Sequence, residues 1–123
     1  MRRALLSIRD RFDRAGIVLS GLCAVHCVLG ILIVSVLGLG GGALLAPQIH
    51  EIGLALAVAV GTIALGAGFA RHGRPAPLAL GAIGLSLMAM GLLVQHGLGE
   101  AVLTICGVSL VAAAHVWNLR RAY

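Results

Sequence analysis

The sequence predicts an all-α integral membrane protein, a bundle of four transmembrane helices, from three observations. Of its 123 residues, 60% are hydrophobic and 11% are charged, whereas a soluble domain has about half apolar and about a quarter charged residues. The apolar residues form four continuous runs, each long enough to cross a ~30 Å hydrocarbon core as a helix. The runs lack the alternation of β-barrel strands.

The four spans are expected at residues 15–37, 49–70, 76–95 and 99–117, in one domain that covers residues 1–123. The first run is longer than the ~7–15-residue core of a signal peptide, so we expect it to be retained. The short connection between the third and fourth spans predicts an antiparallel hairpin.

Residues 1–14 are expected to form a short amphipathic helix on the cytoplasmic surface, before the first span begins. Apolar side chains recur on one helical face, and arginines and aspartates occupy the rest of the surface. The apolar residues are Met1, Leu5, Ile8 and Phe12. A frayed, charged tail is the alternative.

The nine arginines all belong to segments that would share one side of the membrane. They are Arg2, Arg3, Arg9, Arg11, Arg14, Arg71, Arg74, Arg120 and Arg121. The positive-inside rule then predicts cytoplasmic N- and C-termini, with residues 118–123 as a cytoplasmic tail. Anionic lipid headgroups account for the net charge of +5, and no nucleic acid is needed as a partner.

Small residues are expected to pack the helices together, because lipid provides no hydrophobic drive for helix association. The expected contact faces are Gly53, Ala57 and Gly61 in the second span, and Gly81, Gly84, Met88 and Gly91 in the third. Leu65 is the comparison: its replacement by another large apolar residue should matter much less if it faces outward. Four short helices barely enclose a path, which leaves a homodimer as an open alternative.

The residues that could carry chemistry lie inside the first span. Cys23 and Cys27 are four residues apart and His26 follows Cys23 by three, so all three share one side of a helix. Thiolate and imidazole are ligands for Hg(II), Cu(I) and Zn(II). An ionisable side chain roughly 12–18 Å inside the membrane marks a functional site by default. The alternative is that the cysteines pack as small hydrophobes and His26 bonds to another helix.

Two further candidates lie in the fourth span. Cys106 is a conceivable third thiol, although a single cysteine in a span more often packs. His115, almost opposite Cys106 around the helix axis, could act with Asn118 as an exit relay or simply sit at the interface beside Trp117.

The outer ends of the spans carry a second set of ionisable residues: His50, Glu51, His96 and Glu100. They could form a metal-collecting mouth, since imidazole and carboxylate suit Zn(II), or they could be ordinary interface residues. His72, in the turn after the second span, is expected to be solvated.

Several segments resemble the MerC family of small inner-membrane mercury-resistance proteins. They are Asp13-Arg14-Ala15-Gly16, the segment Leu22 to Cys27, His50 at the start of the second span, and Ala113-Ala114-His115. The resemblance implies a four-helix mercuric-ion transporter of the bacterial inner membrane, with a Cys-x-x-Cys pair in its first helix. That pair falls on Cys23 and His26 here, with Cys27 one position later. Cys23 and Cys27 could hold Hg(II) linearly, while the histidine equally suits Zn(II).

We therefore expect a carrier that moves Hg(II) or Zn(II) and has no permanently bound cofactor. A membrane metal or redox sensor, or an assembly subunit, is the alternative. An enzyme is not expected, because no catalytic or nucleotide-binding motif and no intramembrane carboxylate pair is present.

Overall fold

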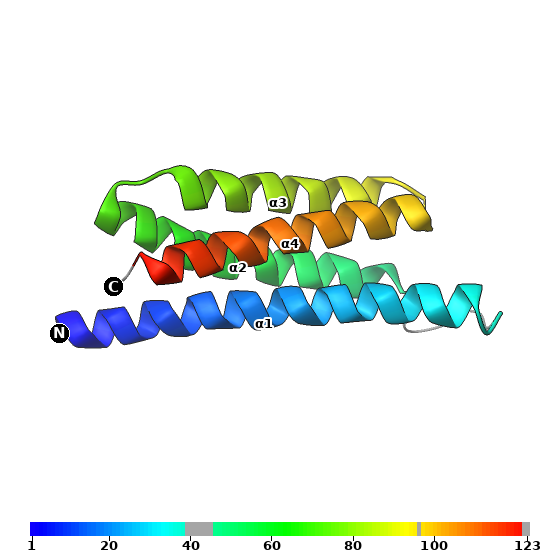
Figure 1. Cartoon of the computed structure of the whole chain (residues 1–123), viewed down its shortest axis with the longest axis horizontal. Coiled ribbons are helices and arrows are strands. Elements are labelled where there is room, and N and C mark those ends of the chain that lie inside the picture. Colours follow the sequence, from blue (N-terminus) through cyan, green and yellow to red (C-terminus); the bar gives the residue numbers. More distant parts are fainter. Residues whose placement is uncertain (39–45, 96, 122–123) are drawn as a thin grey trace.

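The computed structural model describes residues 1–38, 46–95 and 97–121, and these form four helices with no strand among them (Figure 1). The helices are α1 (Arg2–Ser35), α2 (Pro47–His72), α3 (Ala76–Leu93) and α4 (Leu98–Arg120). Each helix is long and apolar enough to cross a membrane. The predicted fold class, an all-α bundle of four membrane-spanning helices, is confirmed.

Helix α1 runs without a break through 34 residues, roughly 51 Å at the usual helical rise. Residues 1–14, expected to form a short helix on the membrane surface, are helical and continue directly into the span. The physical reason is that part of their polar side is not solvated. Arg9 and Asp13 are buried, and Asp13 bonds to side chains of α4, which keeps the segment against the bundle.

The helix ends follow from proline and glycine. Pro47 occupies the first turn of α2, where its missing N–H costs nothing. Gly73 ends α2 in the left-handed conformation, with φ 65°, and its N–H bonds to the carbonyl oxygen of Phe69 at 2.8 Å. The glycine-rich connection at residues 39–45 and the residue His96 lie outside the described part of the chain.

The four helices lie antiparallel, with both termini and the α2–α3 turn at one end (Figure 1). Helix α1 packs on α2 and α4, and α3 packs on α4 and α2. The arginine-bearing segments therefore share one end of the bundle, as the charge asymmetry requires. The side of the membrane that this end faces stays a prediction.

Small residues bring α3 and α4 into contact. Gly81, Gly84, Met88 and Gly91 are all buried, as expected for this face. A Cβ atom on Gly84 would lie 2.6 Å from the carbonyl oxygen of Gly107, so the two backbones meet where neither residue has a side chain.

In α2 the expected face is buried at Ala57 and Gly61 and partly buried at Gly53. Leu65 does not face lipid. It is 2% exposed, and its side chain fills the space that a Cβ atom on Gly81 would need. The small residues of α3 thus make room for a large residue of α2.

Candidate metal centre

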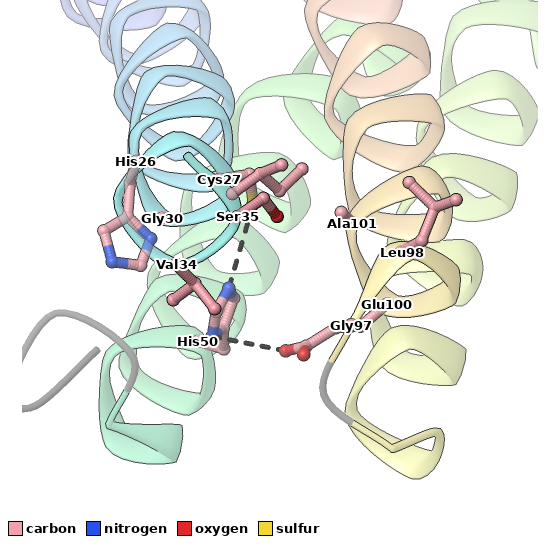
Figure 2. A pocket seen from close by; sticks show the side chains of 11 residues that line it. His26, Cys27, Gly30, Val34, Ser35, His50, Gly97, Leu98, Glu100 and Ala101 are labelled. Carbon is pink, nitrogen blue, oxygen red and sulfur yellow. Dashed lines mark hydrogen bonds and ion pairs between the residues drawn. The ribbon is translucent and has the colours of Figure 1, made fainter. Parts of the chain in front are cut away.

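A thiol and two imidazoles converge at the end of the bundle away from the termini (Figure 2). His26 and Cys27 come from α1, and His50 comes from the first turn of α2. One ligand atom from each lies within 4.8 Å of the other two, and Cys27 is buried. We call these three residues the outer cluster.

The ligand atoms of the outer cluster are near the spacing that a bound ion needs. The Sγ atom of Cys27 lies 3.8 Å from Nε2 of His50, and the rings of His26 and His50 are 5.2 Å apart between centroids. Tetrahedral Zn(II), with bonds of ~2.3 Å to sulfur and ~2.1 Å to nitrogen, separates these atoms by roughly 3.6 Å. Small side-chain rotations would therefore complete a three-ligand site.

Glu100, in the first turn of α4, lies beside Nδ1, the other ring nitrogen of His50. Its Oε1 lies 3.5 Å from Nδ1 of His50, and Glu100 is only 7% exposed. This ion-pair contact places the carboxylate on the Nδ1 side of the ring and leaves Nε2 for a metal. His50 therefore presents Nε2 to the Cys27 thiol.

The outer cluster lies in a pocket of about 360 Å³ between α1, α2 and α4. Apart from the cluster and Glu100, most of its lining is apolar (Figure 2). The apolar and small lining residues include Gly30, Ile31, Val34, Leu98 and Ala101. A pocket of this kind lets an ion shed water before it meets the ligands, which strengthens each electrostatic contact.

Cys23 is not part of this cluster. It lies one helical turn from Cys27 toward the N-terminus, is partly buried, and faces Gly53 of α2, where a Cβ atom would lie 3.7 Å from its Sγ. The expected trio of Cys23, His26 and Cys27 thus stays a prediction. The structure gathers two of these residues and adds His50.

The other candidate residues of the outer ends and of α4 do not all lie near the outer cluster. Of the expected mouth, His50 and Glu100 face each other, Glu51 is exposed, and His96 lies outside the described residues. Cys106 is exposed on α4, away from the cluster.

His115 lies deep in the bundle, in the half that holds the termini. It is fully buried and its Nδ1 donates to Oδ1 of Asp13 at 2.8 Å. Asn118 donates from Nδ2 to the other oxygen of Asp13 at 2.9 Å, and to the carbonyl oxygen of Ala64 at 3.1 Å. Asp13 is fully buried too, so these bonds hold a carboxylate inside the bundle.

Two more residues extend this network, and one corrects an expectation. His72 is not simply solvated, because its Nε2 lies 3.0 Å from Oδ1 of Asn118. Its Nδ1 accepts a bond from the backbone N–H of Arg74 at 3.1 Å, so Nε2 carries the hydrogen. Arg9 places Nε 3.8 Å from Oδ2 of Asp13.

Asp13 is the functional candidate that the sequence reasoning missed, because it was assigned to the solvated side of a surface helix. A signal was available in the spacing. The stripe of small and polar residues on α1 repeats every three or four positions, and one more turn toward the N-terminus reaches Asp13. The full stripe is Asp13, Gly16, Ser20, Cys23, Cys27 and Gly30.

The model of the family described as MerC mercury resistance protein matches residues 13–120. The chain belongs to the MerC family. No curated protein and no solved structure matched. Membership of MerC, together with four membrane-spanning helices, makes this a multi-pass membrane protein of a mercury-resistance family.

Proposed function

We propose that the chain carries a thiophilic divalent ion across the bacterial inner membrane, with the outer cluster as its first binding site. The single observation that supports this most strongly is the convergence of Cys27, His26 and His50 within 4.8 Å. Membership of the MerC family favours Hg(II) as the ion, and Zn(II) is the alternative.

The donor set supports both ions in different ways. One sulfur and two imidazole nitrogens suit Zn(II), with a fourth position left for water or an incoming group. Hg(II) prefers soft thiolate ligands, so the Cys27 thiolate would be its main ligand here. In either case the ion replaces the thiol proton.

The position of Cys23 supports movement rather than storage. It lies one turn from Cys27 on the same helix, about 6 Å along the axis, and farther from the pocket. An ion on Cys27 would therefore find its next thiol in the direction of the termini. We propose inward transfer from Cys27 to Cys23, driven by the ion gradient or by sequestration in the cytoplasm.

Uptake of radioactive Hg(II) and Zn(II) into cells that produce each variant tests this proposal. We expect Cys27→Ser and Cys23→Ser to abolish protein-dependent uptake, and His50→Gln to reduce Zn(II) uptake more than Hg(II) uptake. Cys106→Ser is the matched control, because this cysteine is exposed and lies away from the cluster. Wild-type uptake by the Cys23→Ser/Cys27→Ser double variant would instead favour a non-transporting membrane sensor or assembly subunit.

A further inference from the structure

A buried carboxylate and a buried imidazole face each other in the half of the bundle that holds the termini. Asp13 of α1 and His115 of α4 are each 0% exposed, and Oδ1 of Asp13 lies 2.8 Å from Nδ1 of His115. Asn118 donates to the second carboxylate oxygen at 2.9 Å. The pair is not part of the outer cluster or of its pocket, so ion capture there does not explain a carboxylate inside the bundle.

One ring nitrogen of His115 is left without a partner. An ionised carboxylate can only accept hydrogen bonds, so Nδ1 of the neutral ring carries the hydrogen and Nε2 has a lone pair. Nε2 is buried, and the described part of the chain offers it no hydrogen-bond partner. A buried polar atom without a partner destabilises the fold, so its retention calls for an explanation. The lone pair of a neutral imidazole is where a proton binds.

The space around Nε2 fits a hydrogen and an acceptor for it. A Cβ atom on Gly16 would collide with the ring at Nε2, so this edge of the ring lies against the backbone of α1. Beside it is a cavity of about 10 Å³ that His115 and Ser20 both line, about the least volume that admits one water. A water at this position would accept from a protonated Nε2 and donate to the Ser20 hydroxyl.

The charged and titratable groups around His115 come from α1 and α2. Asp13 bonds to the ring, Arg9 places Nε 3.8 Å from Oδ2 of Asp13, and Cys23 lines the same small cavity. His72 of α2 belongs to the same hydrogen-bond network. Helix α3 contains no titratable residue. The nearest of these groups to the ring is a carboxylate, which compensates a positive charge.

We propose that Asp13 and His115 form a proton-binding site, in which Nε2 of His115 takes a proton from solvent while Asp13 stays ionised. Nε2 gains an N–H bond, a solvent hydronium becomes water, and the charge of the pair changes from one negative charge to none. The charged ring is then paired inside the bundle, as a buried charge requires. The structure thus assigns an ionisable site that ion capture at the outer cluster does not use.

The proton opposes an ion on Cys23, and this consequence rests on the proposed function. Nε2 of His115 lies against Gly16, seven residues before Cys23, so about 10 Å of helix axis separates the ring from the thiol. The two groups are too far apart to share an ion, but two positive charges at this distance inside a bundle still repel each other. Proton uptake should therefore weaken the hold of Cys23 on the ion by about tenfold and favour its release.

Nitrogen-15 NMR of the ion-free protein in detergent tests the proton site. With labelled histidine, the spectrum distinguishes ring nitrogens with and without a hydrogen, and the signal missing from His115→Gln assigns the residue. Between about pH 9 and about pH 5, we expect Nε2 of His115 to gain a hydrogen while Nδ1 keeps its own. An Nε2 that stays bare over this range, or that carries the hydrogen at its upper end, would overturn the site. If His115→Gln does not fold, substitution of the other histidines one at a time assigns the signal by elimination.

Asp13→Asn tests the carboxylate as the counter-charge of the ring. The charged ring would then be buried beside a neutral amide, so we expect His115 to stay neutral over the same pH range. Asp10→Asn is the matched control, because Asp10 is a neighbouring acid of α1 that bonds to Arg9 at 3.0 Å. It should leave proton uptake by His115 in place. Wild-type proton uptake by Asp13→Asn would contradict the role of this carboxylate.

The link between proton and ion is measured in Cys27→Ser/Cys106→Ser, which keeps Cys23 as its thiol. One equivalent of Hg(II) should raise the proton concentration that charges His115 by about tenfold, since linkage is reciprocal. In the control Cys23→Ser/Cys27→Ser/Cys106→Ser, Hg(II) should leave this titration unchanged. Identical titrations with and without Hg(II) on Cys23 would overturn the link. Uptake that is indifferent to Cys27→Ser would instead overturn the proposed function and leave the proton site standing.

Discussion

Two histidines of this protein are each held by a carboxylate from another helix. Glu100 of α4 faces His50 of α2 at 3.5 Å, and Asp13 of α1 bonds to His115 of α4 at 2.8 Å. In both pairs Nδ1 meets the carboxylate, and Nε2 points toward the side that holds a cysteine. Carboxylates behind imidazole ligands orient the ring and raise its basicity, so ion binding at the outer cluster should depend on Glu100.

The role of Glu100 leads to a first prediction. Glu100→Gln should weaken Zn(II) binding at the outer cluster by about 10–100-fold, because His50 loses the group that orients it. Competition titration with a zinc chelator in detergent measures this. Glu51→Gln is the control: Glu51 is next to His50 in sequence but exposed, and its change should leave the affinity unaltered. Equal effects of the two substitutions would mean that overall charge, not orientation, matters.

A second prediction concerns pH. Zn(II) must displace the proton of the Cys27 thiol to bind its sulfur. Because protons compete with the ion, the apparent affinity should rise with pH, by up to about tenfold per pH unit while one proton is released. Titrations between pH 6 and 8 measure the slope. Cys27→Ser should make the slope smaller, because the thiol proton is no longer there to be released; a slope unchanged by this substitution would exclude the thiol as ligand.

At the scale of residues, the sequence identified the candidate thiol and imidazole groups, but it did not predict which of them meet between helices. The i,i+4 spacing places Cys23 and Cys27 on one side of α1, yet the two thiols face different cavities. Which residue of α2 meets Cys27 depends on the relative placement of two helices, and spacing within one helix carries no information on that. For the same reason His50 was grouped with an outer mouth rather than with the thiol.

Among the helices, α1 contains most of the candidate functional residues, and they lie in one stripe along it. Its buried positions run from Asp13 through Gly16 and Ser20 to Cys27 and Gly30. The stripe runs from the hydrogen bonds of Asp13, along the small cavity beside Cys23, to the pocket that holds the outer cluster. Because one continuous helix holds both thiols, their separation is fixed by the helical rise rather than by loop geometry.

The contact between α3 and α4 gives a prediction on stability. Gly84→Ala places a Cβ atom 2.6 Å from the carbonyl oxygen of Gly107, so the helices must separate, at a cost of about 1–3 kcal/mol. Gly66→Ala is the matched control, because nothing lies within 4 Å of its Cβ position; alanine there should be neutral or slightly stabilising. Thermal unfolding in detergent compares them, and equal melting temperatures would place the Gly84 face outside the tight contact.

The elements themselves were largely predictable, since long apolar runs and proline or glycine ends decide where membrane helices start and stop. The differences from the expected pattern arise from contacts between helices. The charge pattern of residues 1–14 is typical of a surface helix, but Asp13 is buried by its bonds to α4 and Arg9 is buried beside it. Leu65 was expected to face lipid, but Gly81 opens a space for it.

For the whole molecule, all arginine-bearing segments share the end that holds the termini (Figure 1). We expect this end to face the cytoplasm and the anionic lipid headgroups there, which places the pocket of the outer cluster on the opposite side of the membrane. A single cysteine introduced at Ser35 in a cysteine-free background should then react with a membrane-impermeant maleimide added to intact cells. One at Arg74 should react only after lysis. The reverse pattern would invert the topology, and the outer cluster would become the exit.

The central claim is that the protein itself moves the ion along the thiols of α1. The most direct measurement is ion flux into sealed proteoliposomes that contain only the purified protein and an indicator inside. Wild type and Cys106→Ser should fill the vesicles with Hg(II) or Zn(II), whereas Cys23→Ser and Cys27→Ser should leave them empty, even where an ion still binds. Protein that binds the ion but gives no flux, or flux that survives loss of both α1 thiols, would contradict the account.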